Sequence, residues 1–176
     1  MTVPISQLIA DNVRDIPDFP HAGVVFKDIT PLLASPAAFA ATIGHLSDWI
    51  KASGAELVVG IEARGFVLAA PGAIDAGLGF VPLRKPGKLP GATLSQAYAL
   101  EYGEAALEMQ QDAIPPGTGV VVVDDVLATG GTAVAAVKLI ERAGAKVLGI
   151  SCLIEISALG GRAQLVGYRL DTMLTV

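Results

Sequence analysis

Two adjacent carboxylates and a glycine-rich turn follow one another in the middle of the sequence. Residues 120–132 read VVVVDDVLATGGT, so Asp124 and Asp125 stand between a run of valines and a turn that opens a predicted helix. The turn at residues 128–132 can aim backbone N–H groups, two hydroxyls and the positive end of a helix dipole at one anion. The carboxylates can accept hydrogen bonds from vicinal hydroxyls or hold hydrated Mg²⁺. The block therefore predicts a site for a phosphate monoester, the sugar attached to it and a metal ion.

Two common phosphate-binding motifs are missing from the sequence. No G-x-x-x-x-G-K-[ST] occurs, and no G-x-G-x-x-G follows a predicted strand. These absences count against nucleotide hydrolysis and dinucleotide binding. A strand-end acidic pair with a glycine turn chosen for packing would explain DD or TGGT alone about equally well. The contiguous block favours the anion site.

Strands and helices alternate along the chain around this block. Turn signals recur every ten to twenty residues without a repeat or linker, so the 176 residues predict one α/β domain. In such a sheet ligands bind at the carboxyl ends of the strands, where Asp124 and Asp125 are expected. Apolar runs predict strands at residues 57–61, 80–83, 120–123 and 146–155. Periodicity and capping residues predict helices at residues 5–13, 36–53, 66–76 and 132–143.

The regions between and after these elements are less regular. Residues 84–95 hold two prolines and two glycines without periodicity, which predicts a long loop of the kind that often serves as a lid. Residues 98–102 and 105–109 could pair as a short hairpin. The tail after Ser157 is weakly patterned and receives no assignment.

Composition excludes several classes of protein. With 52% hydrophobic and 16% charged residues the chain is not disordered, and its net charge of −5 argues against broad binding to nucleic acid or anionic lipid. The longest uncharged stretch, residues 29–47, contains two prolines and is a poor membrane span. A single cysteine, Cys152, and no secretory signal favour a soluble cytoplasmic protein. Cys152 is interpreted as a core residue, and His21 and His45 as surface residues.

The block at residues 120–132 resembles the phosphoribosyl pyrophosphate (PRPP) binding motif of type I phosphoribosyltransferases. Residues 19–33 (FPHAGVVFKDITPLL), 60–71 (GIEARGFVLAAP) and 84–103, which carry RKPGKLP and YALEYG, are similar to the adenine phosphoribosyltransferases within this family. The resemblance spans nearly the whole chain. It implies a single domain over residues 1–176, with a mainly parallel sheet flanked by helices. A small hood would be built partly from residues 1–34, and residues 84–103 would form a flexible loop.

The resemblance also implies a reaction. The family members transfer the 5-phosphoribosyl group of PRPP to adenine, which gives AMP and pyrophosphate in purine salvage. Mg²⁺ would be held mainly through PRPP and water, with Asp124 as a further ligand. A homodimer is expected. Transfer to hypoxanthine, guanine or xanthine is the nearest alternative, and a PRPP-sensing regulator that binds nucleic acid on the same fold is a more distant one.

The resemblance assigns roles residue by residue. The 5′-phosphate would be held by Ala128, Thr129, Gly130, Gly131 and Thr132. The ribose hydroxyls would be held by Asp124 and Asp125. Pyrophosphate would meet Arg64 and, from the loop that also carries Arg84 and Lys88, Lys85. Glu101 would manage the proton of the attacking nitrogen, with Tyr102 beside it at the substrate. Adenine would lie against Val25, Phe26 and Lys27. Catalysis would thus depend on Glu101, Arg64, Lys85 and Asp125.

Overall fold

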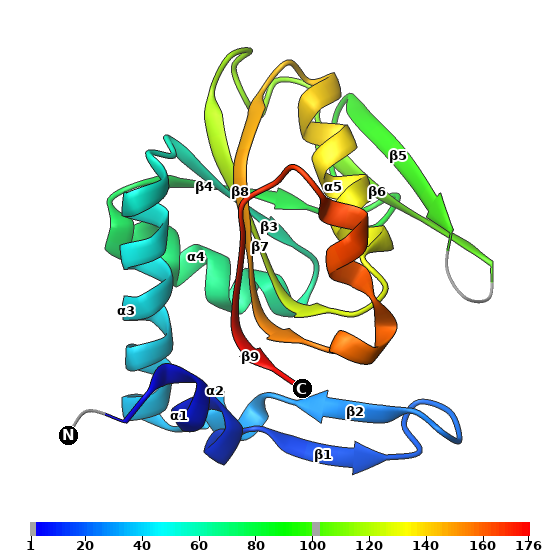
Figure 1. Ribbon diagram of the computed structural model, residues 1–176. Helices are drawn as coiled ribbons and strands as arrows, with labels where there is room; N and C mark the ends of the chain where they lie inside the picture. The colour runs from blue at the N-terminus through cyan, green and yellow to red at the C-terminus, as the bar shows by residue number, and fades with distance from the viewer. Residues whose placement is uncertain (1–2, 100–102) are drawn as a thin grey trace.

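A five-stranded parallel sheet forms the centre of the molecule in the computed structural model, which describes residues 3–99 and 103–176. Its strands lie in the order β4-β3-β7-β8-β9, so β7 is the middle strand, and helices cover both faces (Figure 1). The strands are β3 (Leu57–Ile61), β4 (Gly79–Leu83), β7 (Gly119–Leu127), β8 (Lys146–Glu155) and β9 (Leu170–Thr175). The α/β class predicted from the sequence is confirmed.

The run of valines in β7 is explained by burial on both faces of the sheet. Val121 and Val123 pack into a core with α3 (Pro36–Ser53) and α4 (Arg64–Ala76). Val120 and Val122 point the other way, into a core with α5 (Gly131–Arg142). A strand that is covered on both sides cannot alternate apolar and polar residues, so an uninterrupted apolar run is its normal signature.

The predicted N-terminal hood is a separate layer at the lower end of the sheet in Figure 1. Its two strands pair antiparallel, with Arg14 opposite Asp28 and Pro17 opposite Val25. Ion pairs at 2.6 Å between Arg14 and Asp28 and at 2.7 Å between Lys27 and Asp15 join these strands. The hood comprises α1 (Ile5–Asn12), β1 (Arg14–Pro17), β2 (Val25–Asp28) and α2 (Thr30–Ala34).

The predicted loop at residues 84–95 is shorter in the structure. Its last three residues belong to β5 (Thr93–Ala99), which pairs antiparallel with β6 (Glu104–Gln110). The hairpin that the sequence suggested is present among the described residues, with its first strand beginning five residues earlier than expected; residues 100–102 of that expected strand lie outside the described residues. The sequence of β5, TLSQAYA, does not alternate regularly between apolar and polar residues, so its own pattern did not reveal where the strand begins.

The unassigned tail completes the sheet. Two short 3-10 turns, η1 (Ser157–Leu159) and η2 (Gly161–Leu165), lead into β9, which pairs parallel with β8. Residues Leu170 to Thr172 of this edge strand are only half-buried, so its sequence carries little of the apolar signature seen in β7. None of the helices in residues 3–99 and 103–176 is long and apolar enough to cross a membrane.

Candidate functional site

The glycine-rich turn lies at the carboxyl end of β7 and leads directly into α5. Gly130 is the N-cap of α5 and has a φ of 89°, a left-handed conformation that favours glycine. A small cavity of about 60 Å³ is lined there by backbone and side chains of the turn. The lining includes Asp124, Ala128, Thr129, Gly130 and Thr132. The structure therefore brings the predicted anion-binding turn and one predicted carboxylate to one concave site.

The two carboxylates differ in their surroundings. Asp124 is half-buried and lines the cavity, and its Oδ1 accepts a 2.9 Å hydrogen bond from the backbone N–H of Asp125. Burial and the neighbouring Asp125 charge raise the pKa of Asp124 well above its usual range. Burial also raises the pKa of Asp125, against the opposing effect of Arg64. Buried carboxylates of this kind are stabilised by groups that replace the lost water, such as hydroxyl donors or a cation.

Arg64 connects the carboxylate pair to the hood. Its Nε lies 2.7 Å from Asp125 Oδ2, and its Nη1 donates a 2.9 Å hydrogen bond to the backbone oxygen of Lys27. The same guanidinium lies 4.5 Å from the centre of the Phe26 ring. Arg64, the residue predicted to meet pyrophosphate, thus contacts Asp125, which is predicted to hold ribose. It also contacts Lys27 and Phe26, which are predicted to bind the base.

Close approach of α4 to β7 makes this meeting possible. A Cβ atom on Gly65 would lie 2.9 Å from the backbone oxygen of Val123 and 3.0 Å from Asp124 Oδ1. Any larger residue would push the start of α4, and Arg64 with it, away from the carboxylates. The sequence contained Gly65 within the quoted segment but gave no sign of this role, because the contact joins residues far apart in the chain.

Glu62 is a second residue whose role the sequence left open. Its carboxylate accepts hydrogen bonds from Lys88 Nζ at 2.5 Å and from the backbone N–H of Lys85 at 2.8 Å. Arg84 Nε lies 3.4 Å away, and the Glu62 side chain is only 6% exposed. Glu62 therefore holds the cationic loop, residues 84–88 after β4, next to the turn that precedes Arg64. Burial raises the pKa of Glu62, but hydrogen bonds from Lys88, the Lys85 backbone and Arg84 outweigh it and lower the pKa to about 2.

The predicted base-binding residues lie on β2, at the hood. Val25 is 48% exposed, while Phe26 is half-buried and meets Phe19 edge-to-face with ring centres 5.1 Å apart. Phe19 is itself 51% exposed. An exposed aromatic pair of this kind offers a flat apolar surface, and Phe19 is a candidate that the sequence analysis did not single out. The feature of the sequence that could have pointed to Phe19 is its position in the same segment, residues 19–33, as Phe26.

Two predicted site residues, Glu101 and Tyr102, lie outside the described residues. The hairpin strands β5 and β6 lead to them, with Ala99 opposite Glu104 at the last described pair. Lys85 is exposed and lines a 420 Å³ pocket with Glu104 beside that hairpin. Within residues 3–99 and 103–176, no group of three or more His, Cys, Asp or Glu side chains could hold a metal ion.

Comparison with known proteins identifies the family. The family model of the phosphoribosyl transferase domain matches residues 30–171. The chain belongs to the phosphoribosyl transferase family, and its parallel sheet, hood and strand-end turn are those of the type I fold. The resemblance inferred from the sequence is confirmed.

The most informative relatives are adenine phosphoribosyltransferases. The chain is 57% identical to that of Streptomyces coelicolor over 182 aligned positions, with all of both chains covered, and 55% identical over 176 positions to that of Thermobifida fusca, again with full coverage. The crystal structure of the Thermoanaerobacter pseudethanolicus enzyme is similar with a TM-score of 0.94 at 46% identity, covering 97% of this chain and 99% of the other. The Saccharomyces cerevisiae enzyme, complexed with an imino-altritol bisphosphate and adenine, has a TM-score of 0.90 at 36% identity, covering 97% and 98%.

Glu62→Gln tests the fastening of the cationic loop. Because the pKa of Glu62 is lowered from 4.5 to about 2 in the folded chain, its ionised form stabilises the fold above pH 4.5, and this contribution is lost as the pH falls toward 2. We expect Glu62→Gln to lower the melting temperature near neutral pH and to flatten its decline across this acid window. Thermal unfolding at a series of pH values measures both effects. The exposed Glu104→Gln serves as the control, and an acid decline unchanged by Glu62→Gln would contradict the assignment.

Proposed function

We propose that this chain transfers the 5-phosphoribosyl group of PRPP to N9 of adenine, with AMP and pyrophosphate as products, in purine salvage. The observation that carries the proposal is the full-length identity of 57% to an adenine phosphoribosyltransferase. The geometry supports it, because contacts link a glycine-rich turn, a carboxylate pair, an arginine and an aromatic residue of the hood.

The proposed roles follow the chemistry that each group can perform. The turn at residues 128–132 holds the 5′-phosphate through backbone N–H groups and the hydroxyls of Thr129 and Thr132. Asp124 and Asp125 accept hydrogen bonds from the ribose hydroxyls. Phe26 stacks on the adenine ring, while Val25 and Lys27 border it. These contacts place the anomeric carbon between the base and the pyrophosphate.

The bond changes need charge stabilisation more than covalent catalysis. The bond from N9 to the anomeric carbon forms as the bond from that carbon to the pyrophosphate oxygen breaks. Arg64 and Lys85 stabilise the negative charge that develops on the leaving group. Glu101 takes up the proton that N9 loses, with Tyr102 bordering the substrate. Closure of the cationic loop would exclude water, which otherwise hydrolyses PRPP.

Mg²⁺ is the proposed cofactor. The residues fit an ion that is held mainly by substrate: Asp124 lines the cavity, and no group of three or more acidic, His or Cys side chains that could hold a metal ion is found among the described residues. Mg²⁺ typically binds through one or two carboxylates together with phosphate oxygens and water. When bound, the ion would neutralise charge on the pyrophosphate. Asp124 is the candidate protein ligand.

A base-selection assay tests the activity. Incubation of the purified protein with PRPP, Mg²⁺ and adenine, hypoxanthine, guanine or xanthine in turn should give AMP and pyrophosphate from adenine alone. Turnover should stop with EDTA and return when Mg²⁺ is added. Chromatography of the nucleotides identifies the product. IMP, GMP or XMP without AMP would overturn the choice of base, and nucleic-acid binding without any turnover would overturn the enzyme.

Asp125→Asn tests the ribose contact. An ionised hydrogen bond contributes about 1.5–3 kcal/mol, so kcat/KM for PRPP should fall about ten- to hundredfold. Steady-state kinetics measure the loss, and circular dichroism checks that the variant is folded. Asp75→Asn on the exposed side of α4 is the matched control. If the two variants were equally active, Asp125 would have no role at the substrate.

The proposal includes a cytoplasmic homodimer. Exposed apolar side chains on one helix support self-association, with Ile74 at 78% and Val67 at 40% exposed on α4. Multi-angle light scattering should give twice the 18.0 kDa mass of one chain. A species of 18.0 kDa at working concentrations would contradict the dimer.

A further inference from the structure

The segment between β8 and β9 packs directly against the anion-binding turn. A Cβ atom on Gly161 would lie 2.3 Å from the backbone oxygen of Ala128 and 2.9 Å from the backbone nitrogen of Gly130. In the other direction, a Cβ on Gly130 would lie 2.8 Å from the backbone oxygen of Gly161 and 3.1 Å from Gln164 Cβ. Two backbones are thus in contact without room for a methyl group, and the position of η2 limits the shape of the turn.

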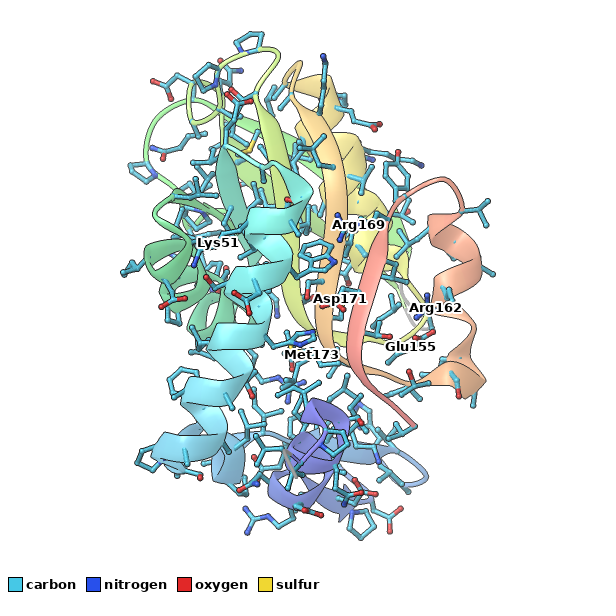
Figure 2. The ribbon with its side chains drawn as sticks, turned by 60° about the vertical axis from the view of Figure 1, so that its left-hand side comes forward. Lys51, Glu155, Arg162, Arg169, Asp171 and Met173 are labelled. Carbon is cyan, nitrogen blue, oxygen red and sulfur yellow. The ribbon has the colours of Figure 1, made fainter. Side chains whose placement is uncertain are left out.

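An ion pair between a half-exposed arginine and a buried carboxylate joins η2 to the sheet. Glu155, the last residue of β8, has a side chain that is 6% exposed. Arg162, the second residue of η2, donates to it from Nε at 2.9 Å and from Nη2 at 2.5 Å. Thr172 of β9 donates to Glu155 at 3.0 Å and accepts from Arg162 at 2.9 Å. Figure 2 shows Glu155 and Arg162 side by side beside β9.

This pair differs from an ordinary surface salt bridge. The Arg162 side chain is 53% exposed, and an isolated exposed pair would contribute little. Here two parallel N–H···O bonds reach a carboxylate that is itself buried, which is the strong geometry for arginine. Loss of the guanidinium would leave the Glu155 carboxylate buried without this charged partner, with neutral hydroxyl groups such as that of Thr172 as its remaining side-chain donors.

Hydrogen bonds within the segment do little to hold it in place. Its turns are closed by short-range bonds, such as that from the Ala163 N–H to the Gly160 oxygen at 3.1 Å. Leu165, which is 2% exposed, anchors the far end of η2 in the core. Ser157 ties the start of the segment to the backbone of Val176, and Arg162, next to Gly161, ties η2 to Glu155 at the end of β8.

We propose that Arg162 and Glu155 are positioning residues for the phosphate-binding turn: they hold Gly161 against Ala128 and Gly130 and so fix the direction of the N–H groups that bind the 5′-phosphate. The inference rests on the proposed function for the ligand of the turn. Neither side chain touches the substrate. Their effect passes through the backbone contact, because anion binding by amides depends on orientation within fractions of an ångström.

Arg162→Gln is the first test. Without the two guanidinium hydrogen bonds to Glu155, η2 can move away from the phosphate-binding turn. The KM for PRPP should therefore rise about five- to fiftyfold. The KM for adenine should change less than twofold, because the hood is not involved. Arg162→Lys keeps the charge but not the two parallel hydrogen bonds of the guanidinium. Its KM for PRPP should lie between those of Arg162→Gln and the parent chain. Calorimetric binding of ribose 5-phosphate should weaken in the same order.

A matched control separates positioning from loss of stability. Arg169 comes from the same C-terminal region, lies 5.3 Å from the Trp49 ring and donates to the Ala52 oxygen, away from the turn (Figure 2). Arg169→Gln should lower the melting temperature without raising the KM for PRPP. Gly161→Ala disturbs the same backbone contact by adding a methyl group. It should weaken ribose 5-phosphate binding although the charges of Arg162 and Glu155 remain.

The outcomes distinguish this inference from the proposed function. AMP formation by the parent chain tests the function alone. If the parent chain makes AMP while folded Arg162→Gln and Gly161→Ala keep their affinity for PRPP and ribose 5-phosphate, the positioning role is wrong and the function stands. If Arg162→Gln does not fold, Arg162→Lys and Gly161→Ala decide in the same way. An equal rise in the KM for PRPP in Arg169→Gln would also overturn the inference.

Discussion

The contacts of Arg64 hold the site together. The side chain begins on α4, lies 2.7 Å from Asp125 at the end of β7 and donates to the backbone of Lys27 on β2. The strands of the hood and of the central sheet are not hydrogen-bonded to one another, although α1 and α2 of the hood pack on the sheet through Ile9 and Leu32. Because Gly65 lets α4 approach β7 so closely, a single guanidinium can reach both layers. Arg64 therefore links the residues proposed for the sugar to those proposed for the base.

The charges around this opening are already paired within the chain. Arg64 lies against Asp125, Lys27 against Asp15, and Lys88 against Glu62. A polyanionic substrate must therefore compete with these carboxylates. This arrangement is consistent with a net charge of −5, because the protein needs no broad basic surface to bind a polyanion. In the proposed site, backbone amides and a few cations released from internal partners would hold the polyanion.

Local patterns predicted the parts of the site that a local pattern can encode. The valines of β7, the acidic pair and the glycine turn are contiguous, so the sequence predicted correctly that they follow one another from a buried strand into a helix. Glu62 was not assigned a role because its partners Lys85 and Lys88 lie more than twenty residues away and carry no signal that points back to it. Edge strand β9 was missed because pairing with β8 compensates for its half-polar sequence. The roles predicted for Glu101 and Tyr102 stay predictions, since they lie outside the described residues.

An anion site built from backbone amides depends on whatever packs against that backbone. The turn at residues 128–132 has small side chains and a glycine with a positive φ, so its own side chains restrict its shape only weakly. Its conformation must be fixed by neighbours, and Gly161 supplies a contact so close that no side chain would fit. In the proposal, the Glu155–Arg162 pair acts on the turn indirectly, because it determines where Gly161 lies. The C-terminal segment, whose sequence showed the weakest pattern, thereby supports the strongest motif in the chain.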